Sequence, residues 1–180
     1  VPLEERSAWS NMICERIRLN PIFHNARTVM LYQSIKGEVQ LKSLERFSEN
    51  SGKKFVYPLC TAPGEMIALY PKTNNAWKKG FCGIMEPVRA CSDEVLHEDI
   101  DLIICPCTVF DTNCNRIGMG GGYYDRFLTR CKKAVKVAVA FEIQKADQII
   151  SQPWDIKMDM ILMLVFVNGC SKNSQLYVLT

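Results

Sequence analysis

Residues 101–107 read DLIICPC, a continuous apolar run bounded by polar residues. Such a run is typical of a central strand that is buried on both faces of a parallel sheet. A glycine-rich turn follows it, then a helical stretch over 123–131 and a second apolar run over 134–141 (AVKVAVAF). A strand, a helix and a second strand in this order predict a βαβ unit.

The same alternation extends along the chain on both sides of this unit. Further strands are expected over 28–32, 54–58, 66–70 and 158–167, and further helices over 3–19, 38–49 and 142–150. Residues 71–96 are expected to be irregular, because they are rich in turn-forming residues. This pattern predicts an α/β fold, a single-domain three-layer sandwich whose mostly parallel sheet carries helices on both faces. Ligands of such sheets bind at the carboxyl ends of the strands.

Composition restricts the classes of function that fit the chain. A length of 180 residues suits one domain over 1–180 with a full core. The net charge is only +3 and the basic residues are scattered, so nothing indicates a nucleic-acid partner. The longest apolar run, 158–167, is too short to span a bilayer, and the N-terminal residues do not form a signal peptide. Neither a membrane nor a nucleic-acid partner is indicated. We expect a cytoplasmic monomer that acts on small molecules.

The cysteines are numerous, but their spacing does not indicate a metal site. There are nine, and no C-x-x-C occurs; Cys105 and Cys107 form a C-x-C. Several lie inside apolar runs, where cysteine behaves as a small hydrophobic residue. We therefore expect reduced structural thiols rather than metal or redox ligands.

Residues 110–126, FDTNCNRIGMGGGYYDR, are the most informative segment for function. Four glycines fall within five residues of this loop: Gly118, Gly120, Gly121 and Gly122. Glycine lets backbone N–H groups approach an oxyanion closely, and the N-terminus of the following helix adds partial positive charge. Arg116 and Arg126 flank the glycines and are suited to bidentate pairing with phosphate oxygens. The alternative is a solvated turn that needs glycine only for its backbone angles, but the flanking arginines favour an anion site.

The loop matches neither of the two common nucleotide-binding signatures. No Lys-Ser or Lys-Thr follows the glycines, and Tyr123 occupies the third glycine position of G-x-G-x-x-G. Asp125 comes just after the glycines and Asp111 ends the preceding strand. Carboxylates beside bound phosphates are typical Mg²⁺ ligands. For Asp125 the alternative is a first-turn acid favoured by the helix dipole.

Several motifs along the chain occur together in one known family. They are LEER at 3–6, YQS at 32–34 followed by Glu38-Val39, FCGIMEP at 81–87, DLIICP at 101–106, Phe110-Asp111, and RIGMGGGYYDR at 116–126. The last motif, preceded by a Gly-Ile-x-Glu-Pro block, is the most specific. The chain resembles the 5-formyltetrahydrofolate cyclo-ligases, also called methenyltetrahydrofolate synthetases, over most of its length.

The resemblance implies ATP- and Mg²⁺-dependent cyclisation of 5-formyltetrahydrofolate to 5,10-methenyltetrahydrofolate, with release of ADP and phosphate. ATP would phosphorylate the formyl oxygen, and nitrogen 10 would then attack the activated carbon. Phosphoryl transfer depends on positioning and charge neutralisation, which agrees with a sequence without an evident catalytic triad. Two alternatives stay open: a non-catalytic folate- or nucleotide-binding module, and a sugar-phosphate isomerase or CoA-transferase-like enzyme on a similar sheet.

The resemblance also implies the site residues. The ATP loop would comprise Arg116, Ile117, Gly118, Met119, Gly120, Gly121, Gly122, Tyr123 and Tyr124, with Arg116 and Tyr124 taking part in catalysis. The folate would contact Gly120, Gly121, Gly122, Tyr123, Gln33, Glu38 and Trp77. Mg²⁺ would be held by Asp125 and Asp155, with Asp159 as the competitor for the second position. An acid such as Glu38 suits the pterin edge because the 2-amino and ring N–H groups are paired donors, although it also fits a first-turn helix acid.

The chain departs from the family pattern at both ends. The pattern begins earlier, with a basic helix that contacts ATP, and no Lys/Arg pair precedes Glu4 here. Either the sequence is trimmed or processed at this end, or those ATP contacts are missing and nucleotide affinity is expected to be lower. Residues 168–180 run beyond the usual end of the pattern, and the sequence predicts no function for them.

Overall fold

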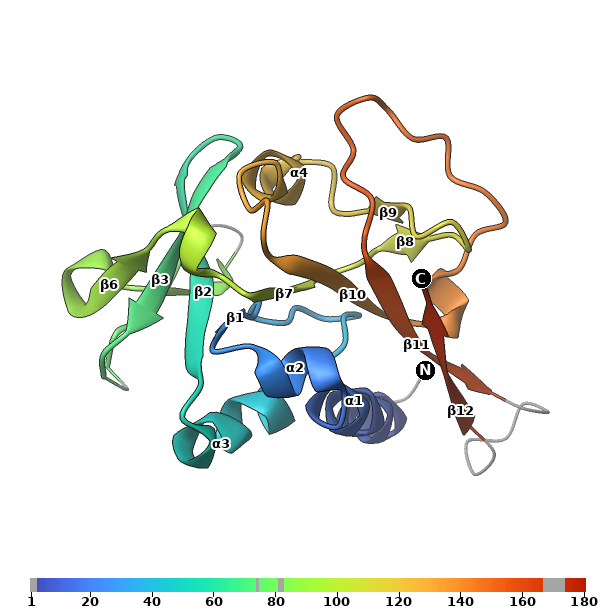
Figure 1. Ribbon diagram of the computed structural model, residues 1–180, viewed down its shortest axis with the longest axis horizontal. Helices are drawn as coiled ribbons and strands as arrows, with labels where there is room; N and C mark the ends of the chain where they lie inside the picture. Colours follow the sequence, from blue (N-terminus) through green and yellow to red (C-terminus); the bar gives the residue numbers. More distant parts are fainter. Residues whose placement is uncertain (1–2, 74, 81–82, 167–173) are drawn as a thin grey trace.

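The computed structural model describes residues 3–73, 75–80, 83–166 and 174–180. Its centre is an eight-stranded sheet (Figure 1). In order across the sheet, the strands are β12 (Ser174–Leu179), β11 (Met160–Phe166), β10 (Val135–Phe141), β7 (Leu102–Cys105), β1 (Thr28–Met30), β2 (Lys54–Ala62), β3 (Glu65–Pro71) and β6 (Ser92–Val95). The strands from β11 to β2 are parallel, and antiparallel strands extend the sheet at both ends. The predicted α/β fold with a mostly parallel sheet is confirmed.

Helices cover both faces of this sheet, as Figure 1 shows. They are α1 (Leu3–Arg18), α2 (Pro21–Asn25) and α3 (Lys42–Ser51) on one face, and α4 (Tyr123–Leu128) on the other. Successive residues of a strand point to opposite faces, so each face has its own apolar core. Leu102 and Ile104 of β7 belong to the cluster that contains Ile13 of α1. Ile103 belongs to the second cluster, with Phe127 of α4. The predicted three layers are therefore present.

Short strands occupy parts of the chain that were expected to be irregular. One hairpin consists of β4 (Trp77–Lys79) and β5 (Met85–Pro87), and a second of β8 (Val109–Phe110) and β9 (Arg116–Ile117). The prediction of irregular structure over 71–96 is wrong, because β4, β5 and β6 all fall in that range. Strands of three or four residues are too short to show alternation in the sequence. Further short elements in the described ranges are 3₁₀ turns at Arg89–Cys91, His97–Asp99 and Glu142–Gln144.

The helix predicted over 142–150 is wrong. Only the 3₁₀ turn at its start forms, and the chain has no further helix or strand until β11. Ile149 is buried, but Ile143 and Ile150 are 81% and 86% exposed, so the apolar residues of this segment do not share one buried face that would stabilise a helix. The backbone N–H groups of Ala146 and Ile149 donate instead to acceptors in the β8–β9 hairpin.

The helix predicted over 38–49 begins later, at Lys42. The chain before it is held in a non-helical conformation by two side chains that donate to the carbonyl of Val39. The Tyr32 hydroxyl lies 2.8 Å from this carbonyl oxygen and the Ser34 hydroxyl 2.9 Å from it. This loop between β1 and α3 is therefore a defined structure rather than the first turn of a helix.

Two other helix boundaries also differ from the prediction. Pro21 ends the first helix as expected, but it also opens α2, where Asn20 Oδ1 accepts the N–H of Ile22 at 2.9 Å. Proline suits the first helical position because that residue needs no N–H donor. The helix predicted over 123–131 ends at Leu128.

The described part of the last residues completes one edge of the sheet. Residues 174–179 form β12, antiparallel to β11. In the described ranges no helix has the length and apolar character needed to cross a membrane. The seven described cysteines are free thiols, and five of them are buried. Burial raises the pKa of Cys105 and Cys107 to about 12, which keeps both thiols neutral.

Candidate active site

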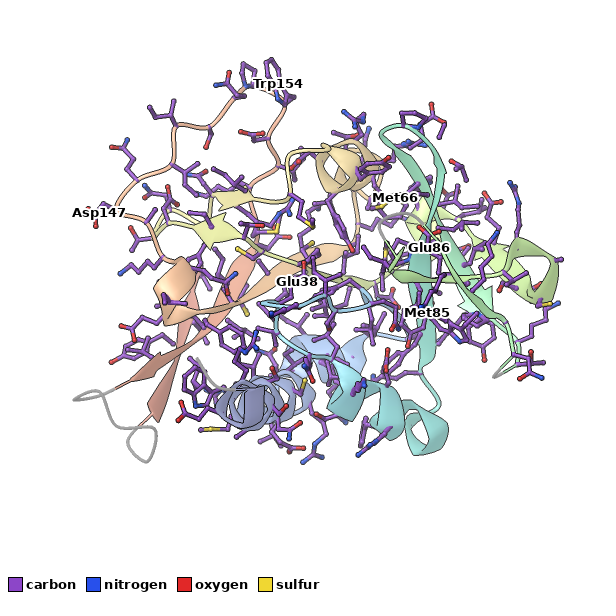
Figure 2. All side chains as sticks on the ribbon, turned by 180° about the vertical axis from the view of Figure 1, so that it is seen from behind. Glu38, Met66, Met85, Glu86, Asp147 and Trp154 are labelled. Atoms are coloured by element: carbon purple, nitrogen blue, oxygen red, sulfur yellow. The ribbon has the colours of Figure 1, made fainter. Side chains whose placement is uncertain are left out.

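Four connections gather at the carboxyl edge of the parallel strands. They follow β1 (31–41), β2 (the turn into β3), β7 (106–122) and β10 (142–159). Figure 1 shows the β2–β3 turn, α4 and the β8–β9 hairpin on this side of the sheet, and in Figure 2 the 142–159 segment extends outward, with Asp147 and Trp154 on it. This edge is where ligands bind in parallel α/β sheets.

The glycine loop has the backbone conformation that its sequence requires. Gly120 and Gly122 have φ angles of +85° and +64°, which residues with side chains rarely adopt. A Cβ atom on Gly120 would meet no described heavy atom within 4 Å, so the space beside it is open. Because α4 has only six residues, the loop backbone rather than the helix dipole must supply most of the attraction for an anion. Ile117 and Met119 project from the loop, 43% and 68% exposed.

Arg116 lies behind this loop, with only 1% of its side chain exposed. Its Nη1 donates to the carbonyl of Pro106 at 3.0 Å, and its Nη2 donates to Asp125 Oδ1 at 3.2 Å. The guanidinium also lies over the Tyr124 ring, 5.5 Å from the ring centroid. Only its Nε lacks a partner among the described residues. The bidentate phosphate contact expected from the sequence would require the guanidinium to leave these acceptors.

Arg126 joins the glycine loop to the β2–β3 turn. Its Nε donates to the carbonyl of Gly64 at 2.7 Å, and its Nη2 donates to the carbonyl of Gly121. A Cβ atom on Gly64 would lie 2.1 Å from the guanidinium, so this contact depends on glycine at the turn. No local pattern predicts the contact, because 62 residues separate the two partners. Like Arg116, Arg126 is committed to protein acceptors.

Replacement of Arg126 by lysine should weaken ATP binding by about tenfold, because an ammonium group cannot hold two carbonyls in the fork geometry of a guanidinium. Isothermal titration with ATP measures the effect. Arg89→Lys is the matched control, since Arg89 pairs with Glu94 on the exposed surface. Wild-type ATP affinity in the Arg126 variant would mean that this contact does not set the loop conformation.

Asp125, at the end of the glycine loop, lies beside the segment that carries Asp155. Asp125 Oδ1 accepts from Arg116 and from the N–H of Ile156, 3.3 Å away, which brings the segment of Asp155 to α4. Asp155 Oδ2 accepts the N–H of Gln152 at 2.7 Å. The second oxygen of each carboxylate has no hydrogen bond to a described residue. Two carboxylates that each keep one oxygen available suit Mg²⁺, which takes one or two carboxylates together with phosphate oxygens and water.

The other candidate acids have different partners. Asp159 Oδ2 accepts the backbone N–H of Lys136 at 2.7 Å, at the start of β10, which favours Asp155 for the metal position. Asp111 is fully buried. Burial alone would raise its pKa, but hydrogen bonds from the Asn115 side chain and from three backbone N–H groups outweigh burial and lower the pKa. Asp111 therefore stabilises its own turn. Over the described ranges no three His, Cys, Asp or Glu residues form a group that would hold a metal without phosphate.

Glu38 and Tyr124 form the second part of the site. Glu38 Oε2 accepts the N–H of Ile35 at 3.0 Å, and burial raises the Glu38 pKa more than this N–H lowers it. Burial also raises the pKa of Tyr124, with smaller contributions from Cys105 and Glu38, so its phenol is neutral. The Tyr124 hydroxyl is buried and has no hydrogen-bond partner among the described residues. Buried polar groups are normally paired, so this hydroxyl is a candidate ligand contact.

Gln33 and Trp77 belong to a neighbouring cluster. Gln33 Nε2 donates to Glu45 Oε1 at 2.8 Å, and Glu45 also forms a hydrogen bond with the Tyr57 hydroxyl. Trp77 packs edge-on against the Tyr57 ring, with the ring centroids 4.8 Å apart. Trp77 is therefore a half-buried side chain packed on the core, and the cluster connects to Glu38 through the loop that carries Gln33.

A Glu38→Gln variant should lose affinity for 5-formyltetrahydrofolate by about tenfold or more, while its thermal unfolding midpoint rises. The pKa of Glu38 is raised in the folded state, so its ionised form opposes folding at neutral pH, and the neutral amide removes that cost. In the wild type, folate affinity should fall as the pH falls through this raised pKa, above the ordinary glutamate value of about 4.3. Titrations from about pH 8 down to the ordinary glutamate pKa of about 4.3 provide the measurement, because this range includes the raised pKa. Equal pH profiles for the two proteins would contradict the prediction.

The fold and its site define the chain as an α/β protein with a glycine-rich loop at the carboxyl edge of a mostly parallel sheet. The model of the 5-formyltetrahydrofolate cyclo-ligase family matches residues 1–164, and the chain therefore belongs to this family. It is an enzyme of the cyclo-ligase type, and the resemblance seen in the sequence is confirmed.

Individual relatives agree with this assignment. The chain is 28% identical over 141 residues to a 5-formyltetrahydrofolate cyclo-ligase of Haemophilus influenzae, covering 76% of this chain and 75% of that protein. It is 28% identical over 176 residues to a mouse protein of the same name, covering 88% and 84%. The solved structure of Aquifex aeolicus 5,10-methenyltetrahydrofolate synthetase superposes with a TM-score of 0.80 at 32% identity, covering 97% of this chain and 84% of that one.

Proposed function

We propose that this enzyme closes 5-formyltetrahydrofolate to 5,10-methenyltetrahydrofolate in a reaction that consumes ATP and uses Mg²⁺. The position of α4 is the observation that carries the proposal. Tyr124 is close enough to Glu38 for the glutamate charge to affect its hydroxyl. The next residue, Asp125, accepts hydrogen bonds from Arg116 and from the 142–159 segment. One helical turn thus joins the residues expected to hold the folate to those expected to hold the phosphates.

In the proposed reaction, the formyl oxygen attacks the γ-phosphorus of ATP and ADP leaves. Nitrogen 10 then attacks the activated formyl carbon and loses its proton, and the carbon–oxygen bond breaks. The released phosphate carries the former formyl oxygen. Such a reaction needs positioning and charge neutralisation rather than a nucleophilic side chain. The raised pKa of the buried thiols Cys105 and Cys107 agrees with this, because neither forms a thiolate near neutral pH.

Different residues of the chain would bind the phosphates, the folate and Mg²⁺. Backbone N–H groups of the loop 118–122 would hold the phosphates, and Arg126 keeps the loop in place. Arg116 orients Asp125 and adds positive charge behind the loop. Tyr124 offers a neutral hydroxyl donor, while Glu38 accepts from the pterin. Asp125 and Asp155 would hold Mg²⁺, which, when bound, offsets the phosphate charge.

We also propose that the protein works as a monomer in the cytoplasm, on small molecules alone. Its scattered charge and the free thiols of the described cysteines support this proposal, because unpaired cysteines suit a reducing compartment. Size-exclusion chromatography with light scattering tests the monomer.

An isotope experiment tests the proposed intermediate. 5-Formyltetrahydrofolate labelled with ¹⁸O in the formyl group is incubated with enzyme, ATP and Mg²⁺, and the phosphate is analysed by mass spectrometry. One labelled oxygen in each released phosphate is expected, because the formyl oxygen bonds to phosphorus before it leaves. Unlabelled phosphate would show that the formyl oxygen does not attack ATP.

A further inference from the structure

The Gly-Ile-Met-Glu-Pro block at 83–87 has no role in the site described so far. It contains Glu86, which is only 7% exposed. The only hydrogen bond that Glu86 forms with the described residues is a long one, from the N–H of Cys60 to Oε1 at 3.4 Å. Its Oε2 has none. The buried Asp111 and Arg116, by contrast, each have several protein partners.

Glycine at position 80 leaves space for the Glu86 carboxylate, and no cation among the described residues pairs with it. A Cβ atom on Gly80 would lie 1.7 Å from Oε2, so this position must be glycine while Glu86 keeps its conformation. Lys78 lies opposite Glu86 in the β4–β5 register. Among the described residues, however, neither Lys78 nor any other cation forms an ion pair with Glu86. A largely buried carboxylate without such a partner is costly unless water or a ligand supplies donors.

Glu86 lies next to the folate side of the site. Its partner Cys60 is near the end of β2 and within electrostatic range of Tyr124, whose hydroxyl is the other unpaired group there. Tyr124 is in turn close enough to Glu38 for the glutamate charge to affect its hydroxyl. Figure 2 shows the two labelled carboxylates on different elements, Glu38 near the middle of the molecule and Glu86 between Met66 and Met85. A ligand beside Tyr124 would therefore lie near both carboxylates.

We propose that Glu86 is a second folate-binding carboxylate, which accepts N–H donors of the substrate on the side away from Glu38. The inference rests on the proposed function. A carboxylate repels the anionic glutamate tail of a folate, so its partner belongs to the pterin and aminobenzoyl part. With the 2-amino group and N3–H of the pterin at Glu38, the donors that remain in that part are the N8–H of the reduced ring and the N10–H of the arylamine.

Isothermal titration of Glu86→Gln with 5-formyltetrahydrofolate and, separately, with ATP tests this role. Loss of a charged acceptor should raise the folate Kd about 10- to 100-fold and change the ATP Kd less than about twofold. Glu86→Asp, which keeps the charge with a shorter reach, should give an intermediate folate Kd. Lys78→Gln is the matched control and should bind both ligands as the wild type does, because Lys78 forms no ion pair with Glu86.

The outcomes separate this role from the proposed function. An unchanged folate Kd in Glu86→Gln, with the wild type binding the folate, overturns the role of Glu86 alone. Equal losses for folate and ATP, together with a lower unfolding midpoint, would make Glu86 structural and also overturn it. If the wild type binds ATP but no 5-formyltetrahydrofolate, the proposed function falls together with this inference.

Discussion

Asp125→Asn should lower kcat by about 100- to 1000-fold and leave the fold intact, because a charge that acts on the transferring phosphoryl group is felt most in the transition state. The asparagine oxygen can still accept from Arg116 and from the N–H of Ile156, so the local structure keeps its hydrogen bonds. What disappears is the negative charge that balances Arg116 and that we propose as a ligand of Mg²⁺. Steady-state kinetics at saturating ATP and folate, with circular dichroism of each protein, provide the measurement.

The same series shows whether one ion joins Asp125 and Asp155. Asp155→Asn should lower kcat less, and extra Mg²⁺ should partly restore its rate, because one carboxylate ligand would remain. The double variant should lose much less than the product of the two separate losses, since both changes act through one metal. Fully multiplicative losses that do not respond to Mg²⁺ would show that the two carboxylates do not share a metal.

Gly120→Val should abolish measurable ATP binding, with a loss of affinity of at least about 100-fold. The valine side chain would occupy the open space beside the loop backbone, where a phosphate is expected to bind. The positive φ of Gly120 adds strain, because a β-branched residue rarely adopts it. ATP titration and thermal unfolding of the variant measure the two effects.

Gly52→Val is the matched control for backbone strain. Gly52 ends α3 and has a φ of +66°, and a Cβ atom added to it would also meet no described heavy atom within 4 Å. This variant should be destabilised to a similar extent and should bind ATP as the wild type does. If Gly120→Val also keeps its ATP affinity, the glycine loop is not the phosphate site.

The central part of the fold was predictable because burial leaves a direct signal in the sequence. The apolar run that forms β7 is buried on both faces, and continuous apolar runs have few other uses in a water-exposed protein. The segment 142–150 has apolar residues at helical spacing, but its stability depends on contacts with the distant β8–β9 hairpin. Such contacts are tertiary, so local periodicity predicted a helix that does not form.

The candidate site, like the fold, could be predicted from the sequence only in part. Glycines that require positive φ, such as Gly120, are visible as residue types, and the loop was predicted from them. The roles of the arginines depend on where each side chain points. Arg126 reaches Gly64 across the sheet edge, and Arg116 turns inward to Pro106. Neither direction follows from their positions beside the glycines. The partner of a long flexible side chain is set by packing and cannot be derived from sequence distance.

The most direct test of the account is the ATP-dependent formation of 5,10-methenyltetrahydrofolate, followed by absorbance with the purified chain, Mg²⁺ and 5-formyltetrahydrofolate. Methenyl product is expected only when ATP and Mg²⁺ are both present, with one ADP formed for each product molecule. A folded protein that binds both substrates and forms no methenyl product would contradict it.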